Sequence, residues 1–93
     1  MSSEDLHAPR ARLTNETVAV HQAIVSLTEE LQAIDWYRQR ADDCDDVELE
    51  AILLHNMNDE MEHAAMLLEW LRRNIGEFAT QLDKFLGVSG PIA

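Results

Sequence analysis

Glu60 and His63 are the residues whose types and spacing best suit metal chemistry in this sequence. Residues three apart in a helix lie one turn apart on the same face, so this carboxylate and imidazole could bind one ion. A lone buried carboxylate is costly unless it is paired or binds a cation. Most of the residues that share the Glu60 face are apolar, namely Leu53, Met57, Ala64, Leu67 and Leu71. We therefore predict a metal site on a buried helix face.

The alternative for Glu60 is a polar residue that faces a groove or pairs with an arginine across an interface. The metal interpretation is favoured because Asn56, Glu60 and His63 all interrupt the same apolar stripe, and few positive residues lie nearby. Glu30 is a weaker candidate, since its acidic neighbours are typical of a solvated surface. It nevertheless lies on the flank of the first predicted helix that would face Glu60 in a closed hairpin.

Tyr37 lies seven residues after Glu30 and shares its flank. Its phenol could hydrogen-bond a ligand carboxylate, or it could simply belong to the core. A carboxylate-rich site with one histidine suits iron or manganese, and zinc, calcium or manganese could take the place of iron in a purified sample. Cys44 is the only cysteine, which excludes a cysteine-rich metal site and an intrachain disulfide and favours a reducing cytoplasm.

Apolar periodicity predicts an all-α chain that forms one domain over residues 1–93. We expect a flexible N-terminal arm over residues 1–13, followed by helices over about 14–41, 46–73 and 75–86. The expected helix-capping residues are Thr14, Asp45 with Glu48, and Asn74 with Glu77. Two long helices joined by a short acidic turn form an antiparallel hairpin.

A two-helix hairpin cannot cover its own apolar stripe. We expect a symmetric dimer in which two hairpins form a four-helix bundle, which would bring four glutamates and two histidines together. A second apolar strip that contains Trp36 predicts a different interface and a larger assembly.

The formal net charge is −11, from 18 acidic and 7 basic residues. This charge disfavours nucleic acid and anionic membrane surfaces as partners. No stretch approaches the roughly 20 apolar residues of a membrane span, and the N-terminus has no apolar leader. We expect a soluble protein that is not secreted.

The segments Glu29–Tyr37, Glu60–Met66 and Leu68–Arg73, with His55-Asn56, closely resemble the encapsulated ferritins over about residues 13–92. These are ferritin-like cargo proteins of encapsulin nanocompartments. The resemblance implies a half-ferritin fold of two antiparallel helices plus a short C-terminal helix. It also implies a ferroxidase centre that forms only across a homodimer, a ring-shaped homodecamer of dimers, and a location in the cytoplasm within an encapsulin shell.

The ligands that the resemblance implies are Glu30, Glu60 and His63 from each of two chains. Iron(II) would be oxidised by dioxygen, and the iron(III) passed to the encapsulin lumen for mineralisation and storage. Glu29 would contribute to a secondary metal site, but the second acid of that site is replaced by Gln32. The docking peptide with which family members commonly end does not occur up to Ala93.

Two other functions remain open from the sequence. One is a different di-metal carboxylate enzyme on the same scaffold, such as a peroxidase. Its preference for one oxidant over another would distinguish it from a ferroxidase. The other is a non-enzymatic acidic helical assembly module, in which Glu60 and His63 could be replaced with little change in iron chemistry.

Overall fold

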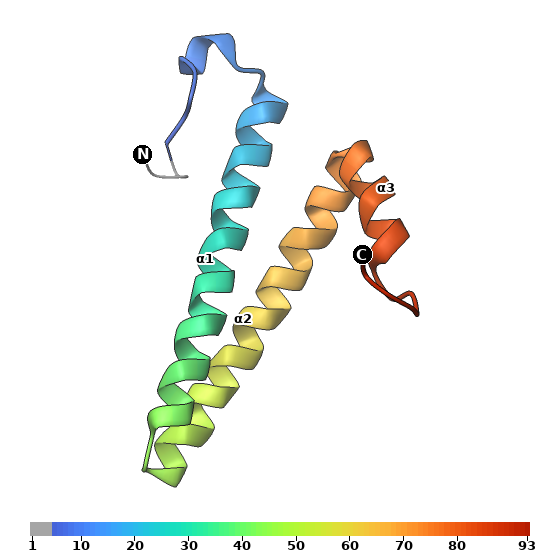
Figure 1. Cartoon of the computed structure of the whole chain (residues 1–93). Helices are drawn as coiled ribbons and strands as arrows, with labels where there is room; N and C mark the ends of the chain where they lie inside the picture. Colours follow the sequence, from blue (N-terminus) through green and yellow to red (C-terminus); the bar gives the residue numbers. More distant parts are fainter. Residues whose placement is uncertain (1–4) are drawn as a thin grey trace.

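Two long antiparallel helices dominate the computed structural model, which describes residues 5–93 (Figure 1). The elements in chain order are η1 (Arg10–Arg12), α1 (Asn15–Asp43), α2 (Val47–Asn74) and α3 (Gly76–Phe85). No strand occurs among the described residues, so the predicted all-α class with a helical hairpin and a short C-terminal helix is confirmed. No helix within residues 5–93 is long and apolar enough to cross a membrane.

Side-chain caps fix where α1 and α2 begin. Thr14 caps α1, as predicted, by accepting a hydrogen bond from the Thr17 N–H at 3.1 Å. The cap of α2 is Asp46 rather than the predicted Asp45, because Asp46 is the last extended residue before the helix. Its Oδ1 accepts a hydrogen bond from the Leu49 N–H at 2.9 Å. The acidic turn offers several capping residues in succession, and the backbone selects one.

The start of α3 differs from the prediction. Asn74 is the last residue of α2, where its side chain donates to the Trp70 carbonyl at 2.8 Å, so it does not cap α3. Ile75 alone links the two helices, and no side-chain hydrogen bond caps α3. An ion pair between Arg72 and Asp83 ties α3 back to α2.

The predicted flexible arm falls partly outside the described residues, since it includes residues 1–4. Its described part contains the single turn of η1. The Arg10 guanidinium donates to the Leu13 carbonyl at 3.3 Å and to Asn15 Oδ1 at 3.1 Å, which joins this turn to the start of α1.

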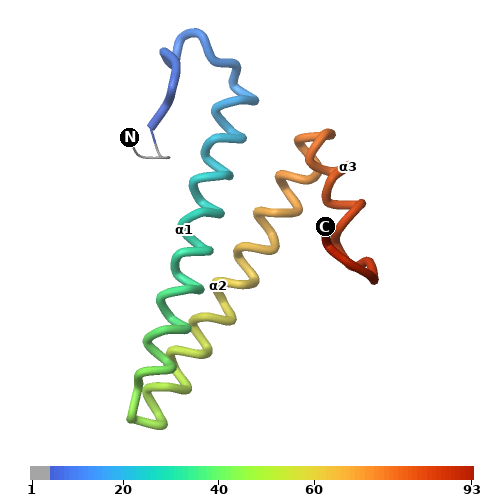
Figure 2. The backbone as a smooth tube through the Cα atoms, viewed as in Figure 1, coloured from blue at the N-terminus to red at the C-terminus, as the bar shows by residue number. Residues whose placement is uncertain are grey.

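The hairpin has a very small core. The two long helices meet at the turn of residues 44–46 and diverge towards the other end (Figure 2). In the described chain the buried apolar side chains are Ala23, Ala41, Ala64 and Leu71. Alanines allow close approach of the helices but bury little area. Many large apolar side chains therefore stay exposed, which agrees with the expectation that a single hairpin needs partners.

Candidate metal centre

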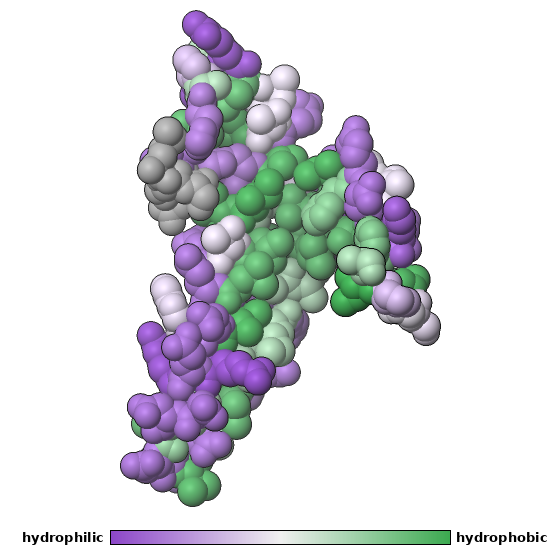
Figure 3. Space-filling view, in the orientation of Figure 1, coloured by the Kyte–Doolittle hydropathy of each residue, from purple (hydrophilic) through white to green (hydrophobic). Residues whose placement is uncertain are grey.

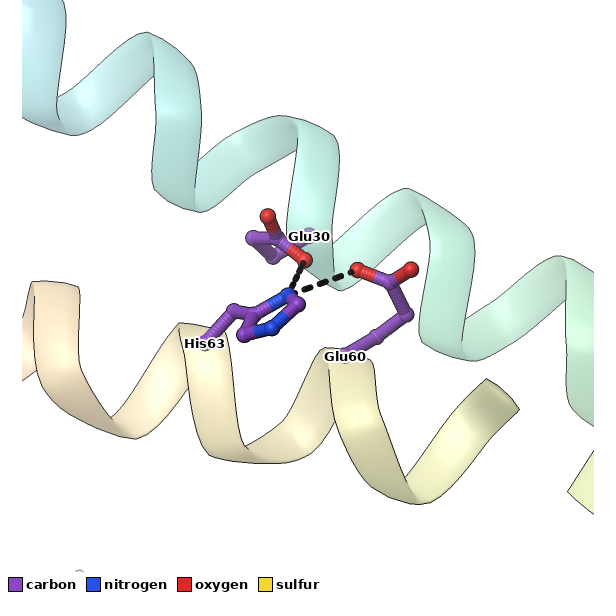
Figure 4. A group of neighbouring side chains, drawn as sticks. All are labelled: Glu30, Glu60 and His63. Carbon is purple, nitrogen blue, oxygen red and sulfur yellow. Dashed lines mark ion pairs between the residues drawn. The ribbon is translucent and has the colours of Figure 1, made fainter. Parts of the chain in front are cut away.

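Three side chains from two helices converge midway along the hairpin (Figure 4). Glu30 comes from α1, and Glu60 and His63 come from α2. One ligand atom from each residue lies within 4.8 Å of the other two. Within residues 5–93 this is the group of histidine, cysteine and acidic side chains with the geometry to hold a metal ion. These residues are the three that the sequence analysis selected.

The imidazole of His63 lies between the two carboxylates. Its Nδ1 is 3.4 Å from Glu30 Oε2 and 3.5 Å from Glu60 Oε2. Glu30 Oε2 is buried and accepts no hydrogen bond of normal geometry within the described chain. The side chain of His63 is 48% exposed, whereas those of Glu30 and Glu60 are 22% and 24% exposed. The cluster is therefore closed between the helices and open at His63.

The two carboxylates perturb each other. The pKa of Glu30 is raised, first because its proton can be shared with Glu60, then because of burial and the Glu60 charge; His63 opposes this shift. Desolvation lowers the pKa of His63, but the two nearby carboxylates of Glu30 and Glu60 favour the charged imidazole more strongly and raise this pKa overall. A cation bound here would therefore compete with protons for both groups.

This donor set fits a divalent transition metal. Two carboxylates and one imidazole are ligands that iron(II) and manganese(II) accept. A cation would also pair with the buried Glu30 Oε2 and relieve the repulsion between the carboxylates. Three protein ligands leave coordination positions free, and the exposed edge at His63 is where further ligands could enter. The arrangement can therefore act as half of a larger site.

The other predicted site residues do not join the cluster. No hydrogen bond within residues 5–93 links Tyr37 to the three ligands; its ring instead lies under the Arg40 guanidinium, 5.6 Å from the centroid. Glu29 is exposed on α1. An ion pair that was not predicted joins His55 Nε2 and Asp59 Oδ2, at 3.4 Å on the surface of α2. Their spacing of four residues was the available signal.

Comparisons with known proteins agree on one family. A family model described as EncFtn-like matches residues 5–89. A protein of Rhodospirillum rubrum named encapsulated ferritin-like protein is 55% identical over 91 residues, which make up 98% of this chain and 65% of that protein. A Thermotoga maritima protein named ferritin-like protein is 42% identical over 90 residues, or 97% of this chain and 79% of that protein.

A solved structure supports the same fold. The crystal structure of a Nitrosomonas europaea protein matches with a TM-score of 0.91 at 50% sequence identity, covering 95% of this chain and 97% of that one. The chain spans 65% and 79% of the lengths of the two curated relatives.

Proposed function

The chain belongs to the EncFtn-like family, and from that premise we propose that it is a ferroxidase that oxidises iron(II) to iron(III) with dioxygen. The centre forms across a homodimer, in which each chain contributes Glu30, Glu60 and His63. The observation that carries the proposal is the cluster itself: two carboxylates and an imidazole within 4.8 Å, with a buried carboxylate oxygen that lacks a hydrogen-bond donor.

Dimerisation completes the centre in this proposal. One chain supplies three ligands, and its cluster is open at His63. A two-fold axis near that edge brings a second set beside the first, for a total of four carboxylates and two imidazoles around two iron(II) ions. Two bound iron(II) ions supply two electrons to dioxygen.

The protein residues contribute binding, position and proton release. Glu30 and Glu60 neutralise the cations and can bridge them, while His63 Nδ1 faces both carboxylates. Because Glu30 and His63 both have raised pKa values, metal binding releases protons from the cluster. Tyr37 is proposed to support the centre only within the dimer, and Glu29 to hold a weak secondary site.

The partners are also proposals. The Rhodospirillum rubrum relative is named as encapsulated, and we extend this to a homodecameric ring that delivers iron(III) for storage inside an encapsulin shell. An open ring has no cavity of its own for mineral, so storage belongs to the shell.

Aerobic iron(II) oxidation, followed by absorbance, tests the proposal with His63→Ala as the main variant. The matched control is His55→Ala, because His55 lies on the same helix but outside the cluster. We expect fast oxidation by the wild type and the control, and oxidation at the buffer rate by His63→Ala, with native mass recorded for each protein. Equal rates in all three proteins would refute a ferroxidase centre here. Faster turnover with hydrogen peroxide than with dioxygen would indicate a peroxidase-like enzyme instead.

A further inference from the structure

The N-terminal arm folds back beside the first turns of α1, and the two segments line one cavity (Figure 1). This cavity has a volume of about 310 Å³. Its walls come from residues 5–8 of the arm, from Leu13 at the end of η1, and from Thr17 and His21 on α1. Thr17 and His21 are four residues apart, so one face of α1 is turned towards the arm. Two segments that η1 separates in the sequence therefore meet around one space.

Hydrogen bonds in η1 direct the arm to this position. The Arg12 N–H donates to the Pro9 carbonyl at 2.9 Å, which closes the turn. The Leu13 N–H donates to the Arg10 carbonyl at 3.1 Å. The Arg10 guanidinium also donates to the Leu13 carbonyl and to Asn15 Oδ1, which joins the turn to α1. The turn thus determines the direction in which the arm leaves α1.

Three candidate metal ligands line the cavity, namely Asp5, His7 and His21. Asp5 and His7 are exposed on the arm, and His21 is half-buried on α1. Two imidazoles and one carboxylate form a nitrogen-rich donor set, which suits zinc(II), copper(II) and nickel(II). The cluster midway along the hairpin has the opposite balance, with two carboxylates and one imidazole. The two groups of ligands therefore favour different ions.

Apolar side chains complete the wall of the cavity. Leu6, Ala8 and Leu13 line it beside the polar groups. Figure 3 shows hydrophilic and hydrophobic side chains mixed at the end of the molecule that carries the arm, in contrast to the continuous hydrophobic band along α2. An apolar wall limits the access of water to a bound ion and strengthens the attraction between the ion and its ligands. A few polar groups in a partly apolar cavity are typical of a binding site.

The ligands have to move to bind one ion together. Among residues 5–93, only the cluster midway along the hairpin already has three ligand atoms within 4.8 Å of one another. Zinc–nitrogen bonds are about 2.0–2.1 Å long, so His7 and His21 must approach each other across the cavity. Residues 5–9 belong to no helix, and this segment can therefore shift without breaking helical hydrogen bonds. Binding of an ion would draw the arm against α1.

We propose that Asp5, His7 and His21 bind one divalent ion of the zinc(II) class, which fastens the N-terminal arm to α1. The ion accepts one carboxylate oxygen and two imidazole nitrogens, and water completes a tetrahedral shell. This site lies at the end of the hairpin away from the turn and uses no residue of the proposed ferroxidase centre. The inference therefore does not depend on the ferroxidase activity.

Limited trypsin digestion of the whole chain tests the proposal, because trypsin cleaves after arginine and Arg10 and Arg12 lie between the proposed ligands. An ion that joins the arm to α1 holds this segment closed. At about ten times its dissociation constant, zinc(II) should slow cleavage at both arginines by about tenfold in the wild type. The matched control His55→Ala, which removes a histidine outside the cavity, should be protected equally. We expect no protection in His7→Ala or in His21→Ala.

Zinc(II) affinity, measured by competition with a coloured chelator, gives a second result. These measurements use the His63→Ala background, in which the cluster midway along the hairpin has lost a ligand. A further His7→Ala or His21→Ala should raise the zinc(II) dissociation constant by at least about tenfold, whereas His55→Ala should leave it unchanged.

Circular dichroism checks that each variant keeps its helices. Zinc(II) that fails to protect the wild type, or that protects His7→Ala and His21→Ala as well as wild type, would overturn the inference. Protection and affinity that are lost in His55→Ala instead would also overturn it. Loss of iron oxidation in His63→Ala alone bears only on the ferroxidase centre.

Discussion

The two sides of the hairpin are built from neighbouring residues but have opposite chemistry. Along α1 the order is Glu29, Glu30, Leu31, and along α2 it is Asp59, Glu60, Met61. In both helices an acid precedes the ligand and an apolar residue follows it. A step of one residue in a helix changes the direction of a side chain by about 100°. A single repeated tripeptide pattern thus places the acidic ligands towards one side and large apolar side chains towards the other.

This difference separates permanent from conditional association. Apolar burial acts at any metal concentration. In the proposed dimer, the His63 side would attract its partner only when a cation pairs with the Glu30 and Glu60 carboxylates.

Glu60→Gln should almost abolish metal binding at the cluster of Glu30, Glu60 and His63. Loss of this carboxylate should weaken metal binding and slow iron oxidation by at least about 100-fold, more than loss of an outer hydrogen-bond partner costs. Without metal, the same variant should melt at a higher temperature than wild type at neutral pH, because the carboxylate whose hydrogen bond and charge raise the Glu30 pKa is gone. Oxidation assays and thermal melts with a chelator check both parts. A metal-free variant that melts below wild type would contradict the proposed repulsion.

Lowering the pH should weaken metal binding at the cluster. The metal affinity should fall by up to about tenfold per pH unit for each proton that the metal displaces. Glu30 and His63 have pKa values raised above 4.5 and 6.5, so both stabilise the metal-free fold below these values. That stability is lost as the pH rises through the raised pKa values. Metal should therefore raise the melting temperature more at pH 7.5 than at pH 5.5, whereas association through the exposed apolar surface should hardly change. Calorimetry in buffers of different ionisation enthalpy would count the released protons.

Salt should strengthen the association of the chains in the absence of metal. Raising sodium chloride from about 0.1 M to about 1 M shortens the Debye length from about 10 Å to about 3 Å. Repulsion between the acidic chains is then screened, so metal-free dimerisation should strengthen by a few fold. Sedimentation in a chelator measures this change. A dimer that dissociates in high salt would indicate a contact made by ion pairs rather than by apolar burial.

Substitutions at the N-terminal cap of α2 serve as controls, because the cap lies outside both the metal cluster and the exposed apolar surface. Asp46→Ala removes the side-chain cap of α2 and should destabilise the fold by about 1 kcal/mol. Asp45→Ala, one residue earlier, should have little effect. Neither variant touches the ligands or the exposed apolar surface, so oxidation and oligomeric state should match wild type wherever the protein is folded. Equal losses of stability in both variants would argue against Asp46 as the cap.

Most of the hairpin could be predicted because its periodicity is strong over two long helices. Glu60 and His63 could be paired from spacing alone, since both lie on one helix. Glu30 was a weaker prediction. Its role as a metal ligand depends on how α1 faces α2, and the spacing of residues within α1 does not determine that. The cap of α2 was wrong by one residue because Asp45 and Asp46 are chemically equivalent, and only the backbone conformation at the turn distinguishes them.

Helical spacing separates the two sides in the sequence, but it does not show which of them stays uncovered in the folded hairpin. Steps of three and four residues define a stripe more than 100° wide, and such a stripe includes both Leu67 beside Glu60 and Met57 on its flank. Which flank is covered, and which stays open, depends on the position of the second helix. His63 and Met61 are two residues apart and therefore point in directions about 160° apart around α2, so periodicity already assigns them to different strips.

The divergence of α1 and α2 from their shared turn makes the hairpin a tapered body, narrow at the turn and wide at the other end (Figure 1). Tapered bodies that pack side against side do not stack in a straight line, because each neighbour is tilted by the same angle and the tilts add up to curvature. Where every contact is a two-fold and two kinds of contact alternate, a closed assembly contains an even number of chains. In the proposed ring, the taper of each hairpin would therefore help to set the curvature.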